Sequence, residues 1–350
     1  MNNIHIDSIT KLKSPYEIKK KYNINYEDIL FINESRTIIN DIINNKNNKK
    51  FIIVGPCSIH DYHQCITYAK FIKKCKEEFS NIVIVIRLYF EKPRTIKGWK
   101  GYLYDPDLDN SNDISKGLIK TRELLIEITK MRIPIATEFL DTIIPQYIDD
   151  LISWGCIGAR TVESQLHRQL ASGLSMAIGF KNRTDGNKEI AINAMLASRE
   201  SHSFLGVDNN GQASIVNTLG NKNTCIVLRG DCVNGCNFDN SNINLTREML
   251  RNKNLNEVII VDVSHDNTLL ENKKNYKKQI NNIELILNMW SSNNHTICGI
   301  MIESNINEGK QSINDKPLKY GISITDGCIN IEDTYYILSN INNTLNSNSL

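Results

Sequence analysis

The sequence predicts an α/β fold, a closed (β/α)8 or TIM barrel with an N-terminal arm and an inserted β-hairpin. Eight short runs rich in Ile and Val recur along the chain, and such runs are typical of strands buried in a parallel sheet. Helical patterns separate most of these runs, and most of the runs end in a charged or reactive residue. Strand–helix alternation on this scale favours a closed barrel.

The predicted strands cover residues 51–57, 82–90, 133–139, 156–161, 177–182, 224–230, 258–265 and 297–304. The predicted helices between them cover 64–78, 114–131, 144–154, 165–174, 189–200, 246–253 and 276–289. The main alternative is an open doubly wound sheet. Neither a G-x-G-x-x-G after the first run nor a G-x-x-x-x-G-K-[ST] occurs in the sequence, so a nucleotide-binding version of that sheet has little support.

Three segments complete the expected organisation. Residues 1–48 predict an arm, with its best helix at 34–43, that packs on a neighbouring subunit or caps the barrel bottom. Residues 49–340 predict a single catalytic barrel, and Asn209-Asn210-Gly211 predicts a β-hairpin over 204–218, inserted between the fifth and sixth strands. The Asn-rich end, 341–350, is expected to be a disordered tail.

Composition excludes several classes of protein. The chain has 350 residues, of which 41% are hydrophobic and 23% charged, as in soluble globular proteins. A net charge of +2 gives no argument for a nucleic-acid or membrane surface. No apolar run approaches the ~20 residues of a membrane span, and no signal peptide is evident. Nine cysteines without framework spacing favour a reduced, cytoplasmic protein.

Cationic side chains gather where the barrel rule places active sites, at the C-terminal ends of the strands. They are Arg87, Lys92, Arg94, Arg160, Lys181 and Arg229. Several cations in one barrel mouth are costly unless anions occupy it, so the sequence predicts a ligand with at least two anionic groups such as phosphates. The alternative is that each Arg pairs with a nearby carboxylate, for example Glu138 or Glu163.

A second group predicts a metal site. Cys57, His265 and Glu303 end the first, seventh and eighth predicted strands, which become neighbours when the barrel closes, and Asp326 follows in a later loop. This mixed donor set suits one divalent ion such as Mn²⁺, Fe²⁺, Co²⁺ or Zn²⁺, which could polarise a carbonyl oxygen. Each residue also has a structural interpretation: a core cysteine, a hydrogen-bonded histidine, a partner for an Arg and a helix cap.

The motifs that carry these residues closely resemble those of class I (type Iα) 3-deoxy-D-arabino-heptulosonate-7-phosphate (DAHP) synthases over about residues 3–340. The matching strings are GPCSIHD (55–61), RLYFEKPRT (87–95), GWKG (98–101), GARTVESQ (158–165), GFKN (179–182), LRG (228–230), DVSH (262–265), MIES (301–304) and SITD (323–326).

The resemblance implies a transferase of aromatic amino-acid synthesis that joins phosphoenolpyruvate, erythrose 4-phosphate and water to give DAHP and phosphate. It implies four metal ligands: Cys57, His265, Glu303 and Asp326. It implies that the phosphoenolpyruvate phosphate is held by Arg160, Lys181 and Arg229, and its carboxylate by Arg87 and Lys92. The aldose phosphate would contact Arg94 and Thr95, and Lys100 and Glu138 would complete the substrate site. Lys92, His265 and Asp326 would lie nearest the reacting atoms, with the general acid and base left open.

Further strings resemble the tyrosine-sensitive isozyme: ASGLSM (171–176), MIESNINEGKQ (301–311) and LKYG (318–321). The resemblance implies feedback inhibition by an aromatic amino acid, tyrosine favoured over phenylalanine. The positions that match its effector pocket are Gln146, Leu174, Ser175, Phe204 and Val216. It also implies a homodimer or homotetramer, with the arm and the hairpin as contacts.

Four residues depart from the family pattern: Val162, Ala177, Arg183 and Asp231. Arg183 and Asp231 add charges near the barrel mouth, and Ala177 lies close to the effector positions. Two alternative functions remain: a Schiff-base barrel aldolase that uses Lys181, and a non-catalytic regulator that binds phosphorylated sugars.

Overall fold

Eight parallel strands form a closed barrel in the order β1-β12-β9-β8-β5-β4-β3-β2. The structure is a computed structural model, and it describes residues 2–271, 273–292 and 296–347. The strands are β1 (Lys50–Gly55), β2 (Ile82–Arg87), β3 (Ile135–Glu138), β4 (Trp154–Ile157), β5 (Ala177–Lys181), β8 (Thr224–Leu228), β9 (Ile259–Asp262) and β12 (Ile297–Glu303). The predicted (β/α)8 architecture is confirmed.

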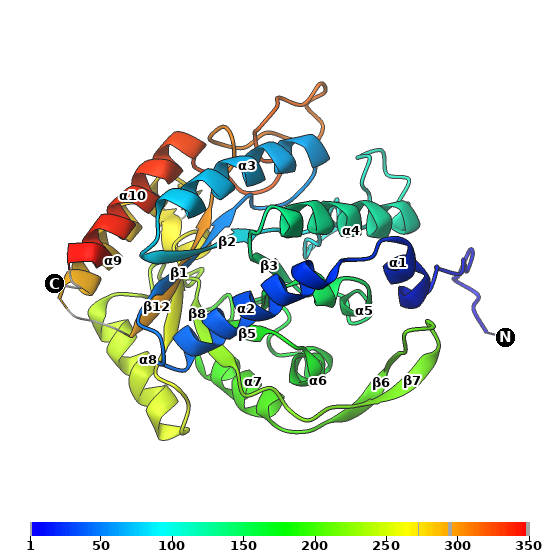
Figure 1. The fold of residues 1–350 in the computed structure, drawn as a ribbon, viewed down its shortest axis with the longest axis horizontal. Helices are drawn as coiled ribbons and strands as arrows, with labels where there is room; N and C mark the ends of the chain where they lie inside the picture. Colours follow the sequence, from blue (N-terminus) through cyan, green and yellow to red (C-terminus); the bar gives the residue numbers. More distant parts are fainter. Residues whose placement is uncertain (1, 272, 293–295, 348–350) are drawn as a thin grey trace.

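Helices surround the barrel (Figure 1). They are α3 (Tyr62–Glu78), α4 (Ile114–Lys130), the short α5 (Pro145–Ile148), α6 (Gln165–Gly173), α7 (Glu189–Arg199), α8 (Asn240–Asn252), α9 (Lys278–Ser291) and α10 (Ile331–Ser347). Three of them begin after an aspartate, Asp61, Asp113 or Asp239, whose side chain accepts a hydrogen bond from a backbone N–H of the first turn. Such caps satisfy donors that the helix itself leaves unpaired.

The boundary between the third helix and the fourth strand differs from the prediction. The helix expected over 144–154 ends early, as α5 followed by the 3₁₀ turn η1 (Asp149–Leu151), and β4 begins at Trp154. Trp154 is fully buried and packs edge-on against Phe51, with ring centroids 6.3 Å apart. Its indole therefore fills the barrel interior rather than a helix face, which an apolar pattern alone does not distinguish.

The tail prediction is wrong for residues 341–347, because α10 continues to Ser347. Ile341 is fully buried, and Leu345 packs against the main hydrophobic core. Burial of this apolar face stabilises the last helical turns despite the surrounding Asn residues. Residues 348–350 lie outside the described part of the chain.

The arm closes the N-terminal end of the barrel. It contains α1 (Pro15–Lys21) and α2 (Tyr26–Ile43), so the helix expected at 34–43 begins eight residues earlier, where Asn25 and Asp28 form a capping box. Ile39 and Ile43 are fully buried in the cluster that fills the barrel interior. Two roles were expected for the arm, packing on a neighbouring subunit and capping the barrel bottom. The single chain shows the second of them.

The hairpin predicted over 204–218 is present as β6 (Ser203–Val207) and β7 (Ala213–Asn217), which extend away from the barrel towards α1 (Figure 1). At its tip the Tyr16 N–H donates to the Asn209 carbonyl at 2.7 Å. On one face the cross-strand pair Leu205 and Ile215 is 85% and 71% exposed. This exposed apolar face supports the expected homodimer or homotetramer, which remains a prediction.

A small insertion that was not predicted follows β9. The 3₁₀ turn η2 (His265–Thr268) leads into a two-stranded hairpin, β10 (Leu269–Leu270) and β11 (Lys273–Lys274). This hairpin carries Lys274 to the C-terminal face of the barrel, where it contacts the candidate site.

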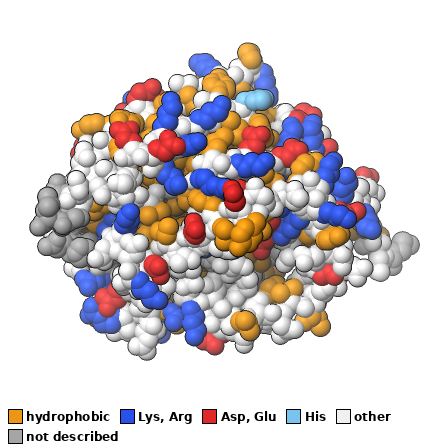
Figure 2. Space-filling model, viewed as in Figure 1, with side chains coloured by type: hydrophobic (Ala, Val, Ile, Leu, Met, Phe, Trp, Pro, Cys, Tyr) orange, Lys and Arg blue, Asp and Glu red, His pale blue; other side chains and the backbone are white. Residues whose placement is uncertain are grey.

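On the surface, Lys and Arg side chains lie among Asp and Glu over the face drawn in Figure 2, in keeping with the small net charge. No helix within the described ranges is long and apolar enough to cross a membrane.

Candidate active site

A pocket of about 290 Å³ at the C-terminal ends of the strands brings both predicted groups together. The sequence-predicted residues that line it are Cys57, Lys92, Arg94, Glu138, Arg160, Lys181, Arg229, His265 and Asp326. These residues come from segments spread over most of the chain, and the barrel places them in one cavity, as the strand-end rule predicts.

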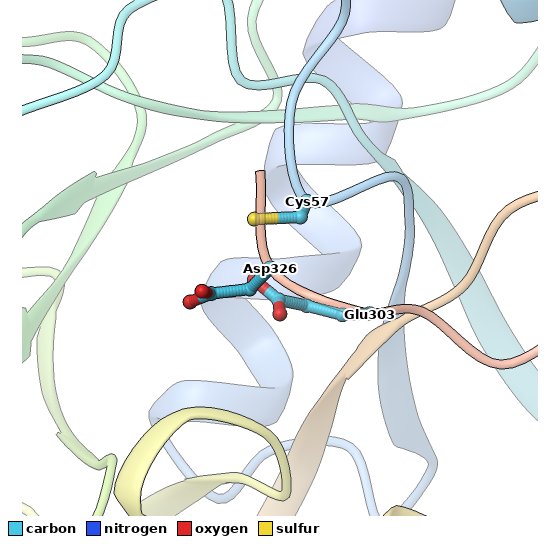
Figure 3. A group of neighbouring side chains, drawn as sticks. All are labelled: Cys57, Glu303 and Asp326. Carbon is cyan, nitrogen blue, oxygen red and sulfur yellow. The ribbon is translucent and has the colours of Figure 1, made fainter. Parts of the chain in front are cut away.

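Three of the four expected metal ligands form a tight cluster. One donor atom each from Cys57, Glu303 and Asp326 lies within 4.8 Å of the others, and Figure 3 shows their side chains gathered from three separate segments. Cys57 follows β1 and Glu303 ends β12; these strands pair so that Gly55 lies opposite Glu303. The Asp326 loop is held to them because the Ile329 N–H donates to the Glu303 carbonyl.

His265, the fourth expected ligand, stands beside this cluster. Its Nε2 lies 3.8 Å from Glu303 Oε1, and its Nδ1 lies 2.9 Å from Asp262 Oδ2. The backbone of His265 is left-handed, with φ +50°, a conformation that few non-glycine residues adopt. Burial lowers the pKa of the imidazole, which favours the neutral form that binds metal ions.

Each donor group of the cluster has a cationic neighbour. Lys92 Nζ lies 3.4 Å from Cys57 Sγ, Arg87 Nη2 donates to Glu303 Oε1 at 2.8 Å, and Lys274 Nζ lies 2.9 Å from Asp326 Oδ2. Although burial would raise the pKa of the Asp326 carboxyl, the Lys274 ammonium holds it below its usual range. Burial and the Glu303 carboxylate raise the pKa of the Cys57 thiol, so binding of a cation there would release a proton.

The donor set fits a first-row divalent ion. A thiolate, an imidazole and two carboxylates suit Mn²⁺, Fe²⁺, Co²⁺ or Zn²⁺ better than Mg²⁺ or Ca²⁺, which prefer oxygen ligands alone. Buried charges of this kind are costly unless they are paired or bind a metal ion, and here they converge on one point. The residues present can therefore hold such an ion.

Arg87 does not face the pocket. Its side chain is fully buried, and its guanidinium also donates to the Pro56 carbonyl at 3.3 Å. Arg87 therefore lies behind Glu303, away from the pocket. This position differs from the expected contact between Arg87 and a substrate carboxylate. Thr95 and Lys100 lie in the exposed loop after β2 and are likewise not among the residues that line the pocket.

Two other expected phosphate ligands have buried carboxylate partners. Lys181 Nζ lies 3.0 Å from Asp262 Oδ2, and Arg229 forms an ion pair with Asp266. Pairing with carboxylates was the sequence alternative, but the partners are Asp262 and Asp266 rather than Glu138 or Glu163. In contrast, Arg94 and Arg160 donate to the backbone carbonyls of Trp99 and Pro93, and within the described chain neither has a carboxylate within ion-pair distance.

The environment of Lys181 argues against Schiff-base chemistry. The side chain is buried, and although burial would lower its pKa, the Asp262 carboxylate raises it above the usual range. A nucleophilic lysine requires a depressed pKa so that the neutral amine is available. Lys181 is therefore suited to bind an anion rather than to attack a carbonyl.

Sequence reasoning missed three charged residues of the site, Asp262, Asp266 and Lys274. Asp262 stands at the end of β9, three residues before His265, so the rule for strand ends could have identified it. Asp266 directly follows His265. Lys274 lies in the unpredicted hairpin, and no pattern in the sequence indicates that this hairpin folds back over the site.

The family departures with new charges make local contacts. Arg183 lies 3.2 Å from Glu163 and 2.5 Å from Asp185, while Asp231 accepts hydrogen bonds from the Val233 N–H and from Asn234 Nδ2. The Arg183 charge is therefore balanced by carboxylates, the Asp231 carboxylate is satisfied by hydrogen bonds within its own turn, and neither residue is among those that line the pocket. Ala177 is buried at the start of β5.

The expected effector positions lie around the hairpin. Phe204 and Val216 are direct cross-strand partners, Gln146 is in α5, and Leu174 and Ser175 follow α6. Leu174 is buried and Ser175 exposed. An effector pocket formed by these five residues remains a prediction.

Comparison with known proteins agrees with this site. The model of the DAHP synthetase I family matches residues 17–339. The Tyr-sensitive phospho-2-dehydro-3-deoxyheptonate aldolase of Escherichia coli (strain K12) is 41% identical over 350 residues, which cover 99% of this chain and 96% of that relative. The phenylalanine-inhibited enzyme of Saccharomyces cerevisiae is 45% identical over 314 residues, covering 87% of this chain and 83% of that relative.

A solved structure extends the agreement to the fold. The phospho-2-dehydro-3-deoxyheptonate aldolase from Francisella tularensis SCHU S4 superposes with a TM-score of 0.94 at 41% sequence identity, covering 97% of this chain and 98% of that chain. The family match and these relatives span nearly the whole sequence, including every residue of the site. The chain therefore belongs to the DAHP synthetase I family.

Proposed function

We propose that this chain is a DAHP synthase, which condenses phosphoenolpyruvate with erythrose 4-phosphate and water to give DAHP and phosphate. The observation that carries the proposal is one pocket in which a thiol–imidazole–carboxylate group adjoins several cationic side chains. The substrates bring two phosphates and a carboxylate, which match the cations, and an aldehyde, which needs an electrophile. The relatives' name, phospho-2-dehydro-3-deoxyheptonate aldolase, denotes the same product.

We propose Cys57, His265, Glu303 and Asp326 as the ligands of one divalent metal ion. When bound, such an ion supplies Lewis-acid polarisation of a carbonyl oxygen. The surrounding side chains have supporting roles: Asp262 orients the His265 ring, and Arg87 orients the Glu303 carboxylate. Residues that hold the ligands in place in this way are expected to tune metal affinity.

Substrate binding is assigned to the cations of the pocket. Arg160, Lys181 and Arg229 would hold the phosphoenolpyruvate phosphate, and Lys92, which is hydrogen-bonded to the Cys57 carbonyl at 3.0 Å, would reach its carboxylate. The aldose phosphate would be bound by the loop after β2, through Arg94, Thr95 and Lys100. Positioning two anions beside the electrophile, with dipoles and charges fixed in advance, would supply most of the rate.

The direct test is phosphate release from phosphoenolpyruvate. We expect release that depends on erythrose 4-phosphate, is abolished by a chelator and is restored by adding Mn²⁺ or Co²⁺. Loss of activity by at least 10³-fold after chelation would correspond to about 4 kcal/mol of barrier. Chelator-resistant turnover that borohydride traps as a covalent adduct on Lys181 would instead support the aldolase alternative, and binding of phosphosugars without any turnover would support the regulator.

We also propose feedback inhibition by tyrosine, supported by the sequence strings and by the Tyr-sensitive relative. We expect L-tyrosine to inhibit at lower concentration than L-phenylalanine or L-tryptophan. Phe204→Ala should raise the half-inhibitory tyrosine concentration by at least 10-fold without changing uninhibited turnover, because it removes an aromatic contact in the expected effector pocket.

Leu205→Ala is the matched control for this variant, because Leu205 is the next residue of β6 and points to the opposite, exposed face. Equal tyrosine sensitivity of Phe204→Ala and wild type would contradict the effector assignment. Phenylalanine as the strongest inhibitor would contradict the choice of tyrosine.

A cytoplasmic location is part of the proposal. All nine cysteines are free thiols, and eight of them are buried or half-buried. Thiols kept without disulfides are typical of a reducing compartment.

A further inference from the structure

A second cavity lies on the other side of the metal-ligand group. Its volume is about 470 Å³, and it shares three lining residues with the substrate pocket: His265, Lys274 and Asp326. We call it the rear cavity. The residues that line it and not the substrate pocket include Lys273, Tyr276, Gln279, Glu303 and Lys310. The wall between the two cavities is therefore formed by the same side chains that are proposed to hold the ion.

The four donors are divided between the two sides. Cys57 lines only the substrate pocket, Glu303 lines only the rear cavity, and His265 and Asp326 line both. An ion in contact with all four would lie within the wall itself. It could therefore be reached from the rear cavity as well as from the substrate pocket.

The charges on the two sides differ. The substrate pocket is lined by six Lys and Arg side chains against two carboxylates, Glu138 and Asp326. The rear cavity is lined by three Lys side chains against two carboxylates, Glu303 and Asp326. Two of the front cations, Lys181 and Arg229, are however paired with Asp262 and Asp266, so the two sides differ more in occupancy than in net charge. The substrate pocket is filled by anions and closed to an incoming ion whenever substrate is bound, whereas the rear cavity is not part of that pocket.

We propose that the rear cavity is the route by which the divalent metal ion enters and leaves, so that metal exchange continues while substrate occupies the front. The inference rests on the proposed metal site. Lys273 and Lys310 are exposed at the rear cavity, and neither has a carboxylate within ion-pair distance among residues 2–271, 273–292 and 296–347. Their charges would repel an incoming cation and set a slow rate of uptake.

The test follows Co²⁺ uptake by the metal-free protein in a stopped-flow instrument. A thiolate ligand gives a charge-transfer absorption with Co²⁺, so the signal reports binding to Cys57 without any turnover. Lys273→Glu and Lys310→Glu should each raise the uptake rate constant about 3- to 10-fold at low ionic strength. The increase should largely disappear at about 0.5 M salt, where the Debye length is a few ångströms.

Lys277→Glu is the matched control, because Lys277 is an exposed lysine that does not line the rear cavity. It should leave the rate constant unchanged. Saturating phosphoenolpyruvate should change wild-type uptake by less than twofold. A tenfold slowing by phosphoenolpyruvate, with the Lys273 and Lys310 variants equal to Lys277→Glu, would overturn the rear route and leave the metal site intact. Absence of any charge-transfer band in wild type would overturn the metal site itself, and the route with it.

Discussion

Replacing Cys57 by alanine is expected to abolish metal binding and to lower turnover by about 10³-fold or more. The thiol is the one sulfur donor of the proposed set, and its removal leaves an imidazole and two carboxylates, one donor short of the set and without its soft ligand. Loss of carbonyl polarisation would cost several kcal/mol of transition-state stabilisation, and each 1.36 kcal/mol is about tenfold in rate. Metal content after dialysis and phosphate release in the same preparation measure both effects.

Cys65→Ala is the control, because Cys65 is an equally buried thiol on α3 that belongs to the hydrophobic core. It should lose roughly 1 kcal/mol of stability at most while keeping full metal content and turnover. Cys57→Ser tests the donor atom at constant size and should bind Co²⁺ without the charge-transfer band. A Cys57→Ala protein with normal metal content and turnover would show that the ion is held elsewhere.

The arrangement of the proposed metal ligands was predictable because it follows from topology. Cys57 and Glu303 are more than 240 residues apart, yet Cys57 follows β1 and Glu303 ends β12, and the last strand of a closed barrel must pair with the first. The β1–β12 register then places Gly55 beside Glu303 and brings the following thiol to the carboxylate. Strand composition and the barrel rule are sufficient for that inference.

The pairing of the buried charges was not predictable, since it depends on side-chain direction at fixed backbone positions. Arg87 ends β2 like the other strand-end cations, but its guanidinium turns inward to Glu303 and stacks on the Tyr89 ring at 3.7 Å. A period-two pattern says on which face a side chain lies, not which of several nearby anions it contacts. The sequence also did not predict how far α10 extends. Its Asn-rich composition suggested a disordered tail, although the apolar residues among the Asn residues form a buried helix face.

Asp262 is the clearest residue that the sequence did not single out, and it links the two halves of the site. Its carboxylate is fully buried, with Oδ2 2.9 Å from His265 Nδ1 and 3.0 Å from Lys181 Nζ. Its Oδ1 accepts hydrogen bonds from the Ser264 N–H at 3.1 Å and hydroxyl at 2.6 Å. One carboxylate thus orients a proposed metal ligand and neutralises a proposed phosphate ligand.

Asp262→Asn is therefore expected to weaken metal binding by about 10- to 100-fold, because His265 Nδ1 loses the carboxylate that lies 2.9 Å away and keeps only the Ser264 hydroxyl, at 2.8 Å, as its partner. It should also lower the free energy of unfolding by roughly 3–5 kcal/mol, since the Lys181 ammonium is left buried without a counterion. Metal titration and denaturant unfolding of the metal-free protein measure the two effects separately.

The pH dependence of this stability loss has a defined sign. Although burial would raise the pKa of Asp262, its interactions with His265 and with the Lys181 ammonium hold it well below its usual range. The stability that the carboxylate contributes is therefore fully present above the pKa of an unfolded aspartate, about 3.9, and is lost as the pH falls through the lower folded pKa. The gap in unfolding free energy between wild type and Asp262→Asn should accordingly be constant near neutral pH and shrink only in acid.

The double variant Asp262→Asn, Lys181→Met separates the two roles of the carboxylate. Removing the unpaired ammonium should restore most of the lost stability, because a buried ion pair can be replaced by apolar groups at little cost. Metal affinity should stay low, because His265 still lacks the neighbouring Asp262 carboxylate. If Asp262→Asn bound metal as tightly as wild type, the orienting role would be wrong; if the double variant were no more stable than Asp262→Asn, the destabilisation would not come from Lys181.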